Sequence, residues 1–408
     1  MNIDSLKGKT IAFAASGGLD SCTITHWLSQ QGVNVICLTA DLGQPDENNF
    51  DEIKERMLSS GAKEFISVDL KSEMAKTGLE VIQCGAKYEG DYWNLTAAAR
   101  QVIIKGFIPI LKKKKINILS HGATGRGNDQ FRFQITAAMY NPDLSFYVPW
   151  RDPKFLEKFK GRKEMIKYCT QHSIPIKASA NQPYSTDANL LGLTHEGGEI
   201  ENLETPMTVV KSGMGKWPLE AQELPKKIRL SFLKGVPIRL NNKNLDLQDL
   251  FETLNIVAGE HGIGIAENLI ENRFIGVKSR GVYESPAMTT LAYAYNQLLQ
   301  QILDKRALEL YRLLSTYLGT QLYQGYWVDL GSIMARNAVV ELTNLVTGDI
   351  VIEMYKGNLI YISTEGVTSG LYNADSSMEN EGNLSHEDAT GLLNILTLCA
   401  KNMSIKRK

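Results

Sequence analysis

Residues 10–21 read Thr-Ile-Ala-Phe-Ala-Ala-Ser-Gly-Gly-Leu-Asp-Ser, and this stretch decides the fold. Its apolar first half is typical of a short buried strand, which the Ser-Gly-Gly triplet breaks. A helical pattern follows over about Asp20–Gln31, and Gly32 ends it as the residue after the last turn. The next apolar run, Val33–Thr39, indicates a second buried strand. This order of strand, glycine loop, helix and strand is typical of a parallel sheet with helices on its faces.

Further strand and helix patterns continue this arrangement to about residue 172. The sequence predicts a helix over 49–60, a third strand over 64–69, and two later strands over 116–120 and 145–148. In such folds the ligand lies beyond the carboxyl ends of the strands. The polar, glycine-rich segments that follow the strands are therefore the expected binding site.

The pattern changes after residue 172, because Pro and Gly make 173–198 loop-like. The elements predicted beyond it are strands over 227–232 and 236–240, helices over 247–258 and 286–316, and a hairpin over 348–361. The final residues are polar and then amphipathic. We expect a division into 1–172, 173–375 and a C-terminal arm, 376–408.

The composition narrows the function. The 408 residues carry 44 Lys and Arg against 45 Asp and Glu, a net charge of −1, which gives no electrostatic support to nucleic-acid binding. The five cysteines are scattered without a CxxC pair, so neither a disulfide framework nor a cysteine zinc site is indicated. No apolar run is long enough for a secretory signal or a membrane span. We expect a cytoplasmic protein that acts on small molecules, with no nucleic-acid or membrane partner.

The loop Ser16-Gly17-Gly18, followed by Asp20 and Ser21, suits a phosphate group. Glycines let the backbone approach an anion closely, and the N–H groups at a helix start point toward it. The two hydroxyl groups add donors. A carboxylate beside phosphate requires a metal between them, and Mg²⁺ is suited to that position. The alternative is an ordinary glycine turn with Asp20 as the helix N-cap.

A second glycine-rich segment, His121–Phe133, follows another predicted strand. A helix that starts near Asn128 places Asn128 and Arg132 on one face, with Asp129 close by. Amide, guanidinium and carboxylate groups together fit the charged ends of an amino acid. The alternative is a generic glycine turn before a solvated helix, and His121 is expected to pack or to hydrogen-bond within the loop.

In chain order, SGGLDS (16–21), HGATGRGNDQFRF (121–133) and ENRFIGVKSRGVYESP (271–286) resemble argininosuccinate synthase, a member of the N-type ATP pyrophosphatase superfamily. Other segments similar to that family are 148–151, 159–162, 183–190 and 322–327. The resemblance runs from about residue 8 to residue 398. It implies an α/β fold with a parallel-sheet nucleotide-binding domain of the adenine nucleotide alpha hydrolase-like type. It further implies an α+β synthetase domain that also multimerises and a helical oligomerisation arm, in a homotetramer.

The family joins L-citrulline to L-aspartate with ATP and Mg²⁺ through a citrullyl-adenylate, giving argininosuccinate, AMP and pyrophosphate in arginine biosynthesis. The resemblance implies catalytic roles for Asp20, Ser16 and Asp129, with Asp20 reaching Mg²⁺ beside the phosphates. The implied ATP contacts are Ala14, Ala15, Ser16, Gly17, Gly18, Leu19, Asp20, Ser21, Cys22, Ala40 and Gly122. The implied aspartate contacts are Thr124, Asn128 and Asp129. The implied citrulline contacts are Tyr92, Thr96, Ala97, Asn128, Arg132, Ser185, Thr194, Glu271 and Tyr283.

Two positions depart from the family pattern, because Asp91 stands where Arg is usual and Leu95 where Gly is usual. A relative that adenylates a different ureido or amide compound is therefore an alternative. A catalytically silent binding protein is a second alternative. Such a protein is expected to lose loop residues such as Ser16, Asp20 or Asp129, and all three are present.

Overall fold

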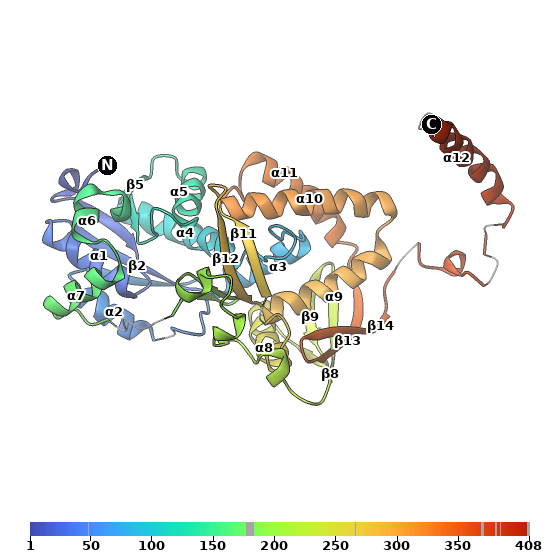
Figure 1. The fold of residues 1–408 in the computed structure, drawn as a ribbon, viewed down its shortest axis with the longest axis horizontal. Helices are drawn as coiled ribbons and strands as arrows, with labels where there is room; N and C mark the ends of the chain where they lie inside the picture. Colours follow the sequence, from blue (N-terminus) through green and yellow to red (C-terminus); the bar gives the residue numbers. More distant parts are fainter. Residues whose placement is uncertain are drawn as a thin grey trace.

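The computed structural model describes residues 1–47, 49–176, 183–265, 267–368, 371–379, 382–383 and 385–405. The chain forms a five-stranded parallel sheet, two antiparallel sheets and a C-terminal helix that lies apart from the body (Figure 1). Within these ranges no helix is both long and apolar enough to cross a membrane.

The parallel sheet has the strand order β3-β2-β1-β4-β5. Its strands are β1 (Thr10–Ala14), β2 (Asn34–Asp41), β3 (Glu64–Asp69), β4 (Ile118–His121) and β5 (Ser145–Tyr147). All neighbouring strands are parallel, which confirms the sheet predicted for this half of the chain. The chain runs outward from β1 to β3 and then returns to place β4 on the other side of β1. The strand order therefore reverses between β1 and β4, where open α/β sheets form their binding crevice.

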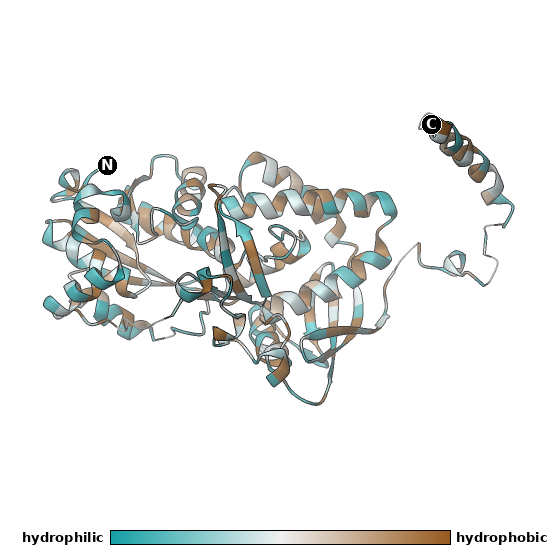
Figure 2. Ribbon diagram, in the orientation of Figure 1, coloured by the Kyte–Doolittle hydropathy of each residue, from teal (hydrophilic) through white to brown (hydrophobic). Residues whose placement is uncertain are grey.

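Helices cover both faces of this sheet. They are α1 (Leu19–Gln30), α2 (Phe50–Ser59), α3 (Lys71–Gln83), α4 (Leu95–Lys114), α5 (Asp129–Tyr140), α6 (Pro153–Lys158) and α7 (Arg162–Gln171). Successive residues of β1 point to opposite faces, so Ile11 and Phe13 pack with Trp27 of α1, whereas Ala12 packs on the α4 side. Apolar residues accordingly gather inside the body (Figure 2).

The second half of the chain forms two antiparallel sheets. One has the order β11-β12-β7-β6, from β6 (Ser185–Asn189), β7 (Gly192–Glu196), β11 (Glu267–Asn272) and β12 (Lys278–Glu284). The other has the order β10-β9-β8-β13-β14, from β8 (Lys226–Leu233), β9 (Val236–Leu240), β10 (Lys243–Asn244), β13 (Gly348–Tyr355) and β14 (Asn358–Glu365). The helices of this half are α8 (Leu247–Glu260), α9 (Pro286–Ile302), α10 (Lys305–Gln324) and α11 (Leu330–Thr343). The hairpin predicted over 348–361 is confirmed as β13–β14.

Residues 173–198 were predicted to be a loop, and for 185–196 that prediction was wrong. These residues form the hairpin β6–β7, whereas 177–182 lie outside the described residues. The polar sequence of β6 gives no strand pattern of its own, and the hairpin is held because β7 pairs with β12, about ninety residues further along. At Gly192 a β-carbon would lie 2.1 Å from the carbonyl oxygen of Glu284, so only glycine permits the approach.

The single helix predicted over 286–316 is two helices, because α9 ends at Ile302 and α10 begins at Lys305. Asp304 is the N-cap of α10, and its Oδ1 accepts a hydrogen bond from the backbone N–H of Ala307 at 2.7 Å. A side-chain cap satisfies an N–H group that a new helix leaves unpaired. The apolar spacing continues across the break, so periodicity alone misses it.

The C-terminal helix, α12 (Asp388–Ile405), stands apart from the rest of the chain (Figure 1). All of its described residues are exposed. Its exposed large apolar side chains are Leu392, Leu393, Ile395, Leu396, Leu398, Met403 and Ile405. In this structure the helix therefore buries none of its apolar surface against its own chain.

Candidate active site

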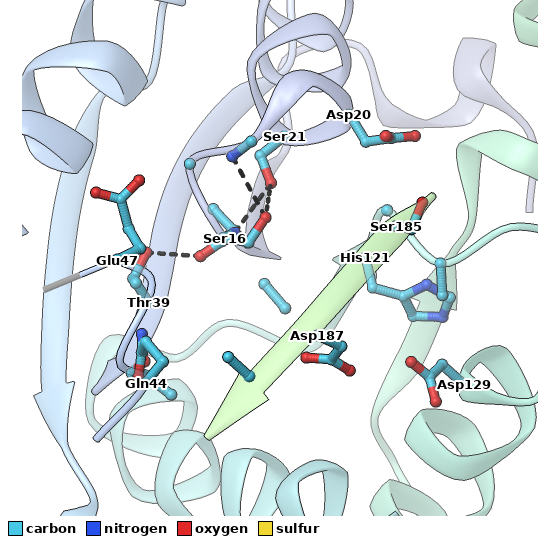
Figure 3. A pocket seen from close by; sticks show the side chains of 18 of the residues that line it. Ser16, Asp20, Ser21, Thr39, Gln44, Glu47, His121, Asp129, Ser185 and Asp187 are labelled. Carbon is cyan, nitrogen blue, oxygen red and sulfur yellow. Dashed lines mark hydrogen bonds between the residues drawn. The ribbon is translucent and has the colours of Figure 1, made fainter. Parts of the chain in front are cut away.

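A cavity of about 750 Å³ opens at the reversal of strand order between β1 and β4. The glycine loop 14–21, the end of β2, Gly122 and Asp129 line it from the parallel-sheet side. The strand β6 adds Ser185 and Asp187 to the lining, and Figure 3 shows Asp187 on the side of the pocket where Asp129 lies. The predicted ATP contacts Ala40 and Gly122 lie in this lining, but Cys22 does not.

Hydrogen bonds between serines hold the glycine loop in shape. The backbone N–H of Ser16 donates to Oγ of Ser21 at 2.9 Å, and the two hydroxyl oxygens lie 3.1 Å apart. Gly17 has φ +77°, a left-handed conformation that favours glycine. The N-cap of α1 is Gly18, which offers no side-chain acceptor to the amides of the first turn. The residues that carry these amides line the cavity, where an anion site requires them.

Asp20 lies in the first turn of α1 and lines the cavity, so its reading as the helix N-cap was wrong. The indole N–H of Trp150 donates to Oδ1 of Asp20 at 3.2 Å. Burial raises the pKa of Asp20, against the hydrogen bond from Trp150 and the positive charge of Arg162. A carboxylate that lines the cavity is suited to meet a metal ion that accompanies an anion.

Four charged groups, of which Arg132 is buried and the other three are partly buried, form a network at another side of the cavity. Arg100 of α4 donates to Oδ2 of Asp129 from Nε (3.0 Å) and Nη2 (2.8 Å), and it also pairs with Asp187 of β6. Nη1 of Arg132 donates to Oδ1 of Asp129 at 2.9 Å. Burial would raise the pKa of Asp129, but Arg100 and Arg132 outweigh burial and lower it. Burial raises the pKa of Asp187. Arg100 opposes this rise only in part, because it is shared with Asp129.

A cage of tyrosines encloses the carboxylate of Glu271 beyond this network. The rings of Tyr92 and Tyr283 stack with centroids 4.3 Å apart, and those of Tyr88 and Tyr323 stack at 3.6 Å. The hydroxyl of Tyr323 donates to Oε1 of Glu271 at 2.8 Å, and the hydroxyl of Tyr283 donates to Oε2 at 3.2 Å. Burial raises the pKa of Glu271, against these hydrogen bonds. A buried carboxylate among aromatic faces is a favourable place for an ammonium group.

Apart from Asp129, which lines the large cavity, the predicted amino-acid contacts gather around this cage with two exceptions. The hydroxyl oxygens of Thr96 and Thr194 lie 3.2 Å apart, and the backbone N–H of Thr96 donates to the hydroxyl of Tyr92 at 3.0 Å. Nδ2 of Asn128 donates to the hydroxyl of Tyr323 at 2.8 Å. The first exception, Ser185, lines the large cavity instead. The second is Thr124, which is exposed and not part of the cavity lining.

The remaining predicted contacts, Ala97 and Arg132, lie close to the cage. Ala97 is buried in the first turn of α4. Nε of Arg132 donates to the carbonyl oxygen of Tyr323 at 2.8 Å, and its guanidinium lies 4.7 Å from the centre of the Tyr323 ring. The cavity and the cage are therefore joined through α5, because Arg132 reaches the cage and Asp129 lines the cavity.

The sequence did not single out Arg100, Asp187, Glu196 or Tyr323, although all four stand at the site. Asp187 and Tyr323 lie inside segments that matched the family pattern without a role. Arg100 follows Thr96 by one helical turn, and Glu196 follows Thr194 on the same face of β7, so their spacing points to the site only once that helix and that strand are placed.

His121 was predicted to pack or to hydrogen-bond within its loop, and the structure places it in the wall of the cavity. Its ring is buried, lines the cavity and stacks on Phe133 with centroids 5.1 Å apart. Burial lowers its pKa to about 3, so the ring is neutral near pH 7. Neither ring nitrogen has a hydrogen-bond partner in the part of the chain that the structure describes, so the predicted loop hydrogen bond is not found there.

The two departures from the family pattern lie at different depths. Leu95 is buried at the start of α4 and belongs to the main core. Its side chain packs beside Gly192, where a β-carbon would lie 2.7 Å from Cδ1 of Leu95. Asp91 is exposed, in a turn closed by Tyr88 and Tyr92. Neither side chain lines the large cavity.

The glycine loop allows a matched test. We expect Gly17→Ala to abolish measurable ATP binding, because the new β-carbon would lie 2.8 Å from Cγ2 of Ile53 and displace the loop. Gly8→Ala is the control, since Gly8 has φ +75° but nothing within 4 Å of a β-carbon. It should lose about 1 kcal/mol of stability and retain ATP binding. Calorimetric titration with ATP checks both variants, and equal ATP affinity in the two would contradict this account of the loop.

Comparison with known proteins shows the family to which the chain belongs. Residues 10–175 match the family model described as the arginosuccinate synthase N-terminal HUP domain, and residues 184–403 match that of the arginosuccinate synthase C-terminal domain. The chain is 37% identical over 390 residues to the argininosuccinate synthase of Rhodopirellula baltica, covering 95% of this chain and 96% of that one. It is also 37% identical to the argininosuccinate synthase of Thermotoga petrophila, covering 98% of each. The U34-tRNA thiolase NcsA of Methanococcus maripaludis is similar over 44% of this chain and 62% of its own, with 12% identity and a TM-score of 0.27. On its full-length relatives and both family models, the chain belongs to the argininosuccinate synthase family of ATP-dependent ligases.

Proposed function

We propose that ATP binds in the large cavity and citrulline in the tyrosine cage, so that the ureido oxygen of citrulline meets the α-phosphorus where the two adjoin. The observation that carries this assignment is the link through α5, in which Asp129 lines the cavity and Arg132 reaches the cage. Placing two reactants in contact is the main contribution that a site without a covalent nucleophile can make.

In this proposal the phosphates rest on the amides of the loop 14–21, with adenine near Ala40. Among the described residues no three His, Cys, Asp or Glu side chains gather to hold a metal ion. The single carboxylate of Asp20 still fits Mg²⁺, which usually keeps water and takes phosphate oxygens with one or two carboxylates. Mg²⁺ bound there would neutralise charge on the pyrophosphate. The neutral ring of His121 would supply a hydrogen bond to the nucleotide.

Citrulline would place its ammonium group against Glu271, inside the cage. Its carboxylate would meet Arg132, whose Nη2 has no protein acceptor among the described residues. Attack of the ureido oxygen on the α-phosphorus expels pyrophosphate and leaves the ureido carbon activated. The amine of aspartate, held by Asn128 and Asp129, then displaces AMP from that carbon.

The first test is pyrophosphate release by the purified protein with ATP, Mg²⁺, citrulline and aspartate, leaving out one component at a time. We expect sustained release only with all four, with argininosuccinate and AMP as the other products. ATP binding without release in the presence of citrulline would instead favour a different ureido or amide substrate. Binding of ATP and both amino acids with no turnover on any acceptor would favour the silent binding protein.

The cage predicts a substrate-specific variant. Glu271→Gln removes the charge that meets the citrulline ammonium, and hydrogen bonds to charged groups contribute about 1.5–3 kcal/mol. We therefore expect the KM for citrulline to rise roughly 10- to 100-fold, with little change in the KM for ATP. Glu267→Gln is the matched control on the same strand, because Glu267 is bonded to Ser285 and Thr289 instead. An equal rise in both variants would remove Glu271 from the citrulline site.

We also propose that the chain works as a homotetramer in the cytoplasm, with residues 376–408 as the arm. Support comes from α12, whose apolar side chains are all exposed, and from five cysteines that are all unpaired. The division at residues 172 and 375 stays a prediction. Sedimentation should give four chains for the full protein and fewer after removal of 376–408. A tetramer that survives the truncation would remove the arm from the assembly.

A further inference from the structure

The second half of the reaction requires a proton acceptor. The α-amino group of free aspartate is an ammonium ion near pH 7, and an ammonium nitrogen has no electron pair with which to attack carbon. Two carboxylates near the expected aspartate position are poor acceptors. Both oxygens of Asp129 take hydrogen bonds from arginines, and Asp187 is paired with Arg100.

Glu196 differs from these two carboxylates because it forms no ion pair with any residue that the structure describes. It is the last residue of β7 and lines the large cavity with Asp129 and Asp187. Among the described residues, no ion pair or side-chain hydrogen bond is made by its carboxylate. Its side chain is exposed to the space inside the cavity.

The strand register places Glu196 between the expected positions of citrulline and aspartate. Thr194, a predicted citrulline contact, precedes it by two residues and so points to the same face of β7. In the sheet, Glu196 is opposite Ser185 on β6 and Gly281 on β12. Tyr283 of the cage is opposite Thr194. Glu196 therefore lies between the cage side and the cavity side of the site.

We infer that Glu196 is the general base that takes a proton from the ammonium group of aspartate, once the ureido carbon has been activated. This inference rests on the proposed function. The proton moves from the ammonium nitrogen to the Glu196 carboxylate, and the freed electron pair forms the bond to the ureido carbon. The bond from that carbon to oxygen breaks with its electrons to AMP. The second proton of the attacking nitrogen leaves with the AMP phosphate, so the guanidinium product carries one positive charge.

The charges around Glu196 suit this role. Partial loss of water contact beside the protein groups around the cavity, then the negative charges of Asp129, Asp187 and Glu271, raise its pKa to about 7, while Arg132 opposes them. A base with a pKa near the working pH is present in its basic form and still binds a proton well. Since the carboxylate must be ionised to accept a proton, the aspartate step should slow as the pH falls below about 7.

The experiment separates the two half-reactions. Citrulline-dependent exchange between pyrophosphate and ATP, without aspartate, reports activation of citrulline. Single-turnover formation of argininosuccinate from the preformed adenylate reports the aspartate step. We expect Glu196→Gln to leave the exchange unchanged, to slow the aspartate step roughly 10²- to 10⁴-fold, and to abolish its acid limb. Glu199→Gln, an exposed carboxylate on the same segment, is the matched control and should change neither half-reaction.

A second nucleophile and a second variant complete the test. Hydroxylamine is already a neutral amine near pH 7, so it should trap the adenylate equally fast in wild type and E196Q. Glu196→Asp keeps a carboxylate and should retain an acid limb at a reduced rate. The inference is overturned if E196Q slows exchange as much as the aspartate step, if E196Q keeps the acid limb, or if E196D lacks it. Absence of citrulline-dependent exchange in the wild type would instead overturn the proposed function.

Discussion

The guanidinium group of Arg100 is the interaction on which the arrangement of both substrate sites depends. It is almost buried, and a buried charge is tolerated only where partners compensate for the lost water. Its partners are Asp129, at the start of α5, and Asp187, on β6. One side chain of α4 therefore ties the parallel-sheet half of the cavity to the antiparallel half. Removing one partner of such a group costs about 3–5 kcal/mol, far more than an exposed pair contributes.

The same network distributes protonation among the acidic groups of the site. Arg100 and Arg132 saturate the oxygens of Asp129 and keep that group ionised. Loss of water contact and then this fixed negative charge disfavour ionisation of its neighbours, so Asp187 and Glu196 both have raised pKa values. Carboxylates that line one cavity are thus suited to different chemical roles. Environment, and not residue type, decides which of them binds and which exchanges protons.

The apolar and glycine patterns of the sequence predicted the parallel-sheet half of the fold, in which each strand pairs with a strand close to it in sequence. The glycine loop, its flanking strands and β3 were evident because each strand is a short apolar run that pairs with a neighbour close in sequence. The hairpin β6–β7 was missed because its strands are polar and depend on β12, which lies far along the chain. The break at Asp304 was missed because the apolar period continues through it, although the cap residue itself was visible.

Part of the candidate site was also predicted from the sequence, and the residues that were missed depend on contacts between distant segments. The resemblance named residues that the structure does bring together, from Ser16 and Asp20 at the loop to Glu271 in the cage. Arg100 and Glu196 were not foreseen because a single charge in a helix or strand carries no signal until its partners are placed. Tyr323 joins the cage only through the packing of α10 against α4 and α5.

The separation of α12 from the body has a thermodynamic consequence. A helix that buries nothing adds almost nothing to the free energy of unfolding of its own chain. Its row of leucines and isoleucines gains stability only when another surface covers it, and that gain follows mass action. In the proposed tetramer, the melting temperature therefore depends on the protein concentration. Stability values for the chain have meaning only alongside the concentration at which they were measured.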